Sequence, residues 1–180
     1  MTGRRDFSRR WVFASLMALV PLAVAAGIYT RPVAGHESET DWIARGGGST
    51  LIHGGTGPSA FTPVLTTLSF HAERSGGSVT GAFDCLAVAP EAENGSKSAQ
   101  FTVNVMYVVG TVEGATVSGD TATLTGHAAI TGLGVGTNVP FTFVVRRGGP
   151  GTTAVLTVNT LTSPFHEVLL AGNFEVFRGD

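Results

Sequence analysis

Over most of the chain beyond residue 48, hydrophobic and polar side chains alternate one by one. The alternation is clearest in four segments: 68–73, 101–107, 121–128 and 141–145. A period of two is typical of β-strands that present one face to a core and the other to water. In this phase the interior positions include five aromatic residues: Phe70, Phe101, Phe141, Phe143 and Phe174.

Turn signals separate the alternating segments: 75–77, 93–96, 109–110, 118–120, 134–136 and 148–151. They indicate eight or nine strands, at about 50–54, 64–74, 78–88, 98–109, 111–118, 121–131, 139–147, 153–160 and 170–177. Antiparallel strands of this length and spacing are typical of hairpins. The predicted fold class is all-β, either a closed antiparallel barrel or a two-sheet sandwich.

The first thirty residues follow another pattern. Four arginines precede the uncharged run 11–29, which contains the small residues Ala23-Val24-Ala25-Ala26. This is typical of a secretory signal peptide covering residues 1–25 and cleaved after Ala25. Arg4-Arg5-Asp6-Phe7 resembles a twin-arginine pattern, so the Sec and twin-arginine routes both stay open. The alternative is an uncleaved membrane anchor to about residue 29. Both alternatives predict a secreted or cell-surface protein.

The rest of the chain divides into a linker and one domain. Residues 26–48 are mostly polar and end in Gly46-Gly47-Gly48, which predicts a flexible linker. Trp42 and Ile43 are the exception, either as an apolar plug against a barrel end or as a sticky part of the linker. Residues 49–180 are then a single β-domain.

An outer-membrane barrel is a further alternative, because it too alternates behind a signal peptide. It needs an apolar outside and aromatic girdles, and these segments carry no such girdles. Phe177, near the end of the chain, is followed by Arg178-Gly179-Asp180 rather than standing last. We therefore expect membrane contact only through the N-terminal segment, if it is retained.

Composition narrows the function classes. Charged residues make up 13%, about half the usual share, and there are 25 glycines, which argues against disorder, coiled coils and helical bundles. The formal net charge is −2, and it becomes −5 without residues 1–25. This leaves no basic surplus for nucleic acid. Arginine is by far the commoner basic residue, which we interpret as the mark of a GC-rich bacterial genome.

Residues with metal-binding or nucleophilic chemistry are scattered. The single cysteine, Cys85, cannot form an internal disulfide and is interpreted as a small, half-buried strand residue. The five histidines, none of them in a metal-binding spacing, are His36, His53, His71, His127 and His166. His71 and Glu73 share a strand face and, with His127, form a site only if the strand order brings them together. We expect surface imidazoles and assign no metal or cofactor.

The acidic residues do not indicate a catalytic site either. The candidates for acid–base work are Asp84, Glu113, Asp120 and Glu175. Asp120 fits a turn, and Asp84 lies in mid-strand, where burial would raise its pKa but where an exposed position is expected. His166-Glu167 is the one direct histidine–acid neighbour pair. Residues 132–136 fit a hairpin connection rather than a phosphate loop, and Arg146-Arg147 a solvated pair. We therefore assign no catalytic residues, and whether the protein is an enzyme stays open.

A series of short motifs follows one another along the domain: Gly46–Gly48, Leu68–Ala72, Gly77–Gly81, Ser118–Gly126, Phe141 with Phe143, Gly149–Gly151 and Leu170–Val176. Their order resembles the secreted bacterial β-domains of the post-COAP type. Val-Val-Arg146-Arg147 stands where the family has an aspartate-rich turn. The resemblance implies an extracytoplasmic antiparallel β-domain and brings no catalytic residues with it.

Two classes of function remain. The first is a non-catalytic structural or binding module whose partner is a cell-surface glycan, a protein or a small apolar ligand. The alternative is a small barrel enzyme or carrier of an apolar ligand, similar to cyclases, isomerases or lipocalins. That alternative needs polar groups at one barrel mouth, for which Asp84, His71 and His127 are the candidates.

Overall fold

The computed structural model describes residues 41–52, 63–91 and 101–178. They form eight strands: β1 (Trp42–Ile52), β2 (Leu65–Ser75), β3 (Ser78–Pro90), β4 (Phe101–Ser118), β5 (Thr121–Gly132), β6 (Gly136–Arg146), β7 (Thr153–Val158) and β8 (Phe165–Arg178). The all-β prediction is confirmed for these residues. Within them, no helix has the length and hydrophobicity that a membrane span requires. The predicted leader lies outside the described residues, as do His36, His53 and the turn at 93–96.

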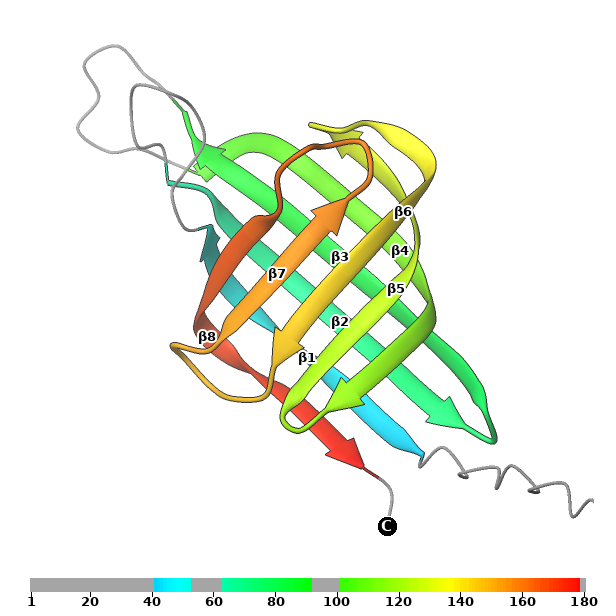
Figure 1. Cartoon of the computed structure of the whole chain (residues 1–180). Helices are drawn as coiled ribbons and strands as arrows, with labels where there is room; N and C mark the ends of the chain where they lie inside the picture. Colours follow the sequence, from blue (N-terminus) through cyan, green and yellow to red (C-terminus); the bar gives the residue numbers. More distant parts are fainter. Residues whose placement is uncertain (1–40, 53–62, 92–100, 179–180) are drawn as a thin grey trace, which may run out of the picture. The chain divides into compact units, whose positions relative to one another are not determined.

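The strands form one closed barrel. Each strand pairs antiparallel with the next, and β1 also pairs with β8, which closes the ring. Figure 1 shows β6 and β7 in the near wall, with β2 and β3 behind them. The sheet is therefore a barrel rather than a sandwich, and the described residues contain eight strands rather than nine. We call the β1–β8 pairing the closure seam.

The barrel interior is filled at its middle by phenyl rings. Phe70, Phe83, Phe141, Phe143 and Phe174 contact one another with ring centroids 4.7–5.6 Å apart. In an eight-stranded barrel the interior is just wide enough for side chains to fill it. Phe83 belongs to this phenyl cluster, although the sequence prediction did not include it. Phe101 was predicted to be interior, and this is wrong: it is only half-buried, at the first position of β4.

The predicted turn at Val109-Gly110 is wrong, because β4 runs straight through it. The segments 98–109 and 111–118 are one strand, paired with β3 on one side and with β5 on the other. Gly110 lies inside the barrel, where a Cβ atom would come within 2.7 Å of Cε1 of Phe141. This glycine makes room for a phenyl ring instead of bending the chain.

The predicted inward face of β4 is also wrong. Met106 and Val108 are buried at 2% and 0% exposure, whereas Val103 and Tyr107 are exposed at 45% and 36%. Both faces of this strand carry hydrophobic side chains, so alternation alone does not distinguish inside from outside. Pairing with β3, which places Val108 opposite buried Cys85, decides the orientation.

The predicted linker to residue 48 is too long, because β1 begins at Trp42. Residues 42–48 are strand, and Trp42 is a core residue rather than a plug or a linker residue. The sequence pattern does not indicate this strand, because its glycines have no side chains and so show no alternation of hydrophobic and polar positions. A Cβ atom on Gly46 would lie 2.4 Å from the backbone oxygen of Asn173, so the close approach of β8 requires glycine here.

The described hairpin connections agree with the turn predictions at 75–77, 118–120, 134–136 and 148–151. β5 ends at Gly132 and β6 begins at Gly136, so residues 132–136 connect these two strands as expected. Gly148–Gly151 lie between β6 and β7, and Gly119-Asp120 between β4 and β5. Glycines in these connections adopt positive φ, among them Gly119, Gly134 and Gly151.

Candidate functional site

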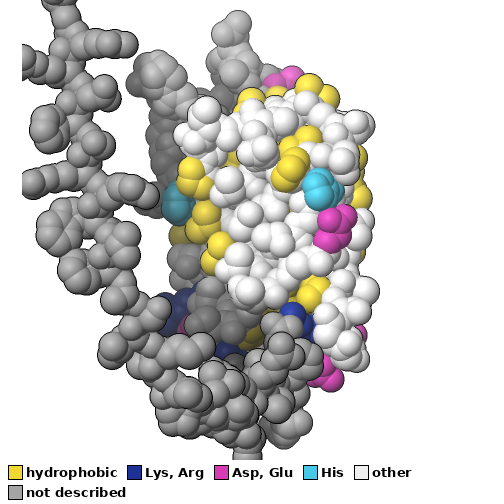
Figure 2. All heavy atoms as spheres, turned by 45° about the vertical axis from the view of Figure 1, so that its right-hand side comes forward, with side chains coloured by type: hydrophobic (Ala, Val, Ile, Leu, Met, Phe, Trp, Pro, Cys, Tyr) yellow, Lys and Arg dark blue, Asp and Glu magenta, His cyan; other side chains and the backbone are white. Residues whose placement is uncertain are grey.

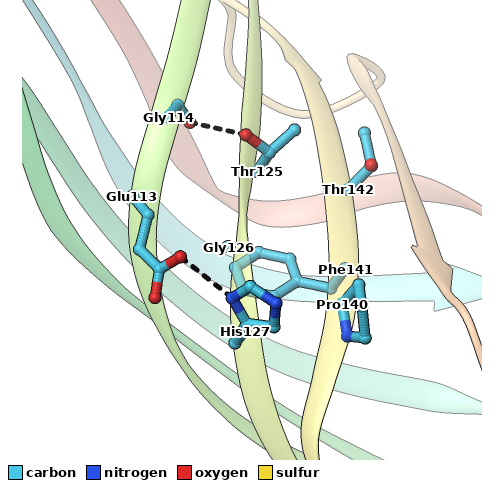
Figure 3. Close-up of a pocket in the computed structure, with 8 residues that line it drawn as sticks. All are labelled: Glu113, Gly114, Thr125, Gly126, His127, Pro140, Phe141 and Thr142. Carbon is cyan, nitrogen blue, oxygen red and sulfur yellow. Dashed lines mark hydrogen bonds and ion pairs between the residues drawn. The ribbon is translucent and has the colours of Figure 1, made fainter.

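A groove crosses the outer face of β4, β5 and β6. It consists of two hollows, of about 390 Å³ and about 290 Å³. Glu113 and His127 line both hollows and separate them, and Figure 3 shows the two side chains pointing toward each other. His127 Nδ1 lies 2.9 Å from Glu113 Oε2. We call the two hollows together the outer groove.

Two irregularities in the sheet shape the outer groove. The register between β4 and β5 shifts between Val112 and Gly114, so Glu113 is the extra residue of a bulge. Bulges re-aim side chains and are common next to binding sites. The register between β5 and β6 shifts as well, and Asn138, which lines the smaller hollow, adopts a φ of 57°. The groove therefore lies where regular pairing is interrupted on both sides of β5.

The lining of the outer groove is mostly neutral. The larger hollow is lined by Glu113, Gly114, Thr125, Gly126, His127, Pro140, Phe141 and Thr142. The smaller hollow adds Val109, Gly110, Thr111, Ala128, Ala129 and Asn138. Figure 2 brings forward the right-hand side of Figure 1, where β4, β5 and β6 lie, and shows few charged side chains around a histidine that lies beside an acidic residue. The groove thus offers hydroxyl, imidazole, carboxylate and apolar groups together.

The Glu113–His127 pair in the groove is exposed. The side chains of His127 and Glu113 are 40% and 56% accessible. Exposed pairs of this kind contribute about 0–1 kcal/mol to stability. Among the described residues, no three His, Cys, Asp or Glu side chains gather in a way that could hold a metal ion. The polar atoms of the Glu113–His127 pair therefore lie at the surface, ready for hydrogen bonds to a ligand.

The structure does not bring His71 and Glu73 to His127. His71 lies on β2, opposite Arg45 of β1 and Ala82 of β3, whereas His127 lies on β5. Two strands, β3 and β4, separate β2 from β5 around the ring. The three-residue site that depended on strand order therefore does not form.

Asp84 is half-buried on the outer face, and it accepts a hydrogen bond of 2.8 Å from the Tyr107 hydroxyl. This hydrogen bond raises the pKa of Tyr107. The outward orientation agrees with the prediction for Asp84. The enzyme alternative needs polar groups that face the interior at one barrel mouth. Because the Asp84 side chain points outward, it is not such a group.

The remaining candidate acids form ion pairs on the outer face. Asp120 lies in the β4–β5 turn, as predicted, and pairs with Arg146 at 2.9 Å. The hydrogen bond from Arg146 lowers the pKa of Asp120. Glu175 pairs with Arg45 at 2.8 Å. Arg146 is solvated as predicted, with its side chain 65% accessible, and it is ion-paired as well.

His166 and Glu167 point to opposite faces of β8, so they are not a pair. His166 is exposed, whereas Glu167 is 2% exposed inside the barrel. Glu167 is hydrogen-bonded to the hydroxyls of Thr50 and Thr66, the latter at 2.6 Å. Sequence reasoning missed this buried acid, although its position two residues before buried Leu169 in an alternating segment was a usable signal.

Cys85 lies in the barrel interior, fully buried and without a disulfide. It is a small strand residue as predicted, though more deeply buried than expected. Burial raises the pKa of its thiol well above the ordinary value, and Glu167 and Asp84 add to this when they are ionised. A thiol that keeps its proton is a poor nucleophile. We therefore assign Cys85 no covalent chemistry.

Comparison with known proteins leaves the fold and the outer groove as the basis for assigning function. No protein-family model, no curated protein and no solved structure matches this chain.

Proposed function

We propose that the chain is an exported bacterial β-barrel module without catalytic activity, which binds a neutral, hydroxyl-rich ligand such as a cell-surface glycan in the outer groove. The observation that carries this proposal is the pair of adjoining hollows on either side of the Glu113–His127 pair. Their position on the outer face leaves them open to a large ligand. The resemblance to secreted β-domains and the predicted leader support export.

The chemistry of the outer groove suits a sugar better than an ion. Hydroxyl groups of sugars both donate and accept hydrogen bonds, and carboxylate, imidazole, amide and threonine groups complement them. Pro140, Val109 and Ala129 offer apolar surface to the C–H faces of a sugar ring. Among the described residues, neither hollow is lined by Lys or Arg. The groove therefore lacks the cationic groups that anionic ligands usually require.

The experiment is an NMR titration of the isotope-labelled chain with neutral oligosaccharides, such as cellohexaose and chitohexaose. We expect shifts concentrated at His127, Thr125 and Asn138. The variants Glu113→Gln and His127→Ala should each weaken binding about tenfold, which is about 1.4 kcal/mol. The matched control is Glu175→Gln, which breaks an exposed ion pair on another wall of the barrel. Binding that both groove variants leave unchanged would contradict the proposal.

One observation favours the alternative of a barrel enzyme or carrier. Glu167, Thr50, Thr66 and Cys85 place polar groups inside the barrel, where a ligand of that class would lie. Native mass spectrometry of the protein isolated from culture medium tests it, because a retained small molecule would appear as an adduct. The same spectrum reports the N-terminus, and a start at Ala26 is expected if the leader is cleaved.

A further inference from the structure

Glu167 lies next to the closure seam and connects three strands. It belongs to β8, its Cα partner on β1 is Ile52, and its carboxylate is hydrogen-bonded to Thr50 of β1 and Thr66 of β2. Thr50 and Thr66 are themselves partners across β1 and β2. All three side chains are almost fully buried, at 2%, 0% and 1% exposure. One acidic group therefore joins the last strand of the barrel to the first two.

The number of protons in this cluster decides which protonation state of Glu167 fits it. The three oxygens, Glu167 Oε2 and the two threonine Oγ1 atoms, make three mutual contacts at hydrogen-bonding range. Each contact between two oxygens needs one proton, and the two hydroxyls supply only two. If Glu167 is ionised, one pair of oxygens faces each other without a proton and repels. If Glu167 carries a proton, the three contacts form a complete ring of hydrogen bonds.

The surroundings of Glu167 also favour the neutral acid. Among the described residues, the neighbouring inward positions are Thr50 and Ile52 on β1, Thr66 on β2 and Ala154 on β7, and none is charged. Cys85 on β3 is the titratable side chain that faces it. Arg74 has the inward register of Ala72 but pairs with Trp42, at the other end of β1. Burial raises the pKa of Glu167, and the two threonine hydrogen bonds offset only part of this effect.

We infer that Glu167 is a neutral carboxylic acid in the folded barrel, and that loss of its proton weakens the closure seam. The barrel thereby contains a proton-controlled device that is independent of the outer groove. The ordinary pKa of a glutamate is near 4.5. Because the folded value is raised, the stabilisation is fully present below the ordinary pKa and is lost as pH rises through the folded pKa. The folded protein is then most firmly closed in acid.

The direct test is an NMR titration of the glutamate carboxyl carbons in the unmodified, isotope-labelled chain. Glu113 and Glu175 lie on the outer face and serve as internal references. We expect the Glu167 signal to remain that of a protonated carboxyl at pH values above the ordinary glutamate pKa of 4.5. If Glu167 ionises together with Glu113 and Glu175, the inference is wrong. This measurement requires no substitution, so it does not depend on whether a variant folds.

A second test links the proton to the seam. Glu167→Gln retains a neutral group that can donate to one threonine and accept from the other. We expect the melting temperature of the wild type to fall as pH rises above the ordinary glutamate pKa of 4.5, and that of Glu167→Gln to change much less. Glu175→Gln, which removes an exposed carboxylate from the same strand, is the matched control and should follow the wild type. Parallel curves for wild type and Glu167→Gln would overturn the inference.

Discussion

The outer and inner faces of the barrel wall place glutamate side chains in opposite environments. Glu113 lies on the outer face in a bulge, beside His127, and its side chain is 56% accessible. Glu167 lies on the inner face beside two threonine hydroxyls and is 2% exposed. Both carboxylates make short polar contacts, so hydrogen bonding alone does not distinguish them. What differs is access to water, which reaches Glu113 and is withheld from Glu167, whose pKa is raised by burial.

This comparison separates two roles for acidic residues in one small domain. On the outer face an ion pair costs little to keep and contributes little to stability, so its groups remain available to a ligand. Inside, a polar group is tolerated only when it is hydrogen-bonded, and removing one member leaves its partners unsatisfied. We therefore expect substitutions of Glu113 to change binding and substitutions of Glu167 to change folding.

The largest expected effect comes from truncating the buried acid. Glu167→Ala leaves a cavity and removes the hydrogen-bond partner of two buried hydroxyls, so we expect a loss of about 2–4 kcal/mol in the free energy of unfolding. Glu113→Ala should cost less than about 1 kcal/mol. Urea denaturation of the two variants at neutral pH measures both. Equal losses would mean that the two sides of the wall do not differ as described.

A smaller effect is expected where a glycine makes room inside the wall. Gly110→Ala places a methyl group against the Phe141 ring, and overpacking of this kind costs about 1–3 kcal/mol. Gly149→Ala is the matched control, because a Cβ atom there meets nothing within 4 Å. Thermal unfolding monitored by circular dichroism compares them. A Gly110→Ala variant as stable as the control would show that the phenyl cluster tolerates the extra methyl group.

The smallest effect concerns the pH dependence of an exposed pair, and its sign is opposite to that of Glu167. Arg146 lowers the pKa of Asp120, so the stability that this pair contributes is present above the ordinary Asp pKa of 3.8. It is lost as pH falls through the lowered, folded value. In a plot of melting temperature against pH, Asp120→Asn should therefore slightly flatten the acid limb and leave the alkaline limb unchanged. A change on the alkaline limb would contradict this assignment.

Much of the fold was predictable, because one face of most strands is apolar and the other is polar. In β5, Ala122 and Leu124 are buried, between threonines that are less buried, and alternation identified this strand and its inner face. The same reasoning failed in β4, where Met106 and Tyr107 are neighbours and both hydrophobic. It also failed in β1, where three consecutive glycines carry no pattern. In these cases the pairing partners decide the structure.

The candidate site was less predictable than the fold. Glu113 and His127 were both noted, but nothing in their spacing of fourteen residues indicates that they touch. Their contact depends on the β4–β5 register and on one bulge residue. Glu167 was noted only for its neighbour His166. The alternation of β8, which separates these two residues onto opposite faces, was recognised only for the later part of that strand.

The sequence by itself determined a chain of antiparallel strands joined by glycine turns, because side-chain alternation and turn conformations are local properties. Tertiary structure alone decided that the ring closes between β1 and β8, that Glu113 meets His127, and that Glu167 lies among threonines in the interior. These features join residues that are distant in the chain. Their energies depend on register, burial and the exclusion of water, and a local pattern contains none of these.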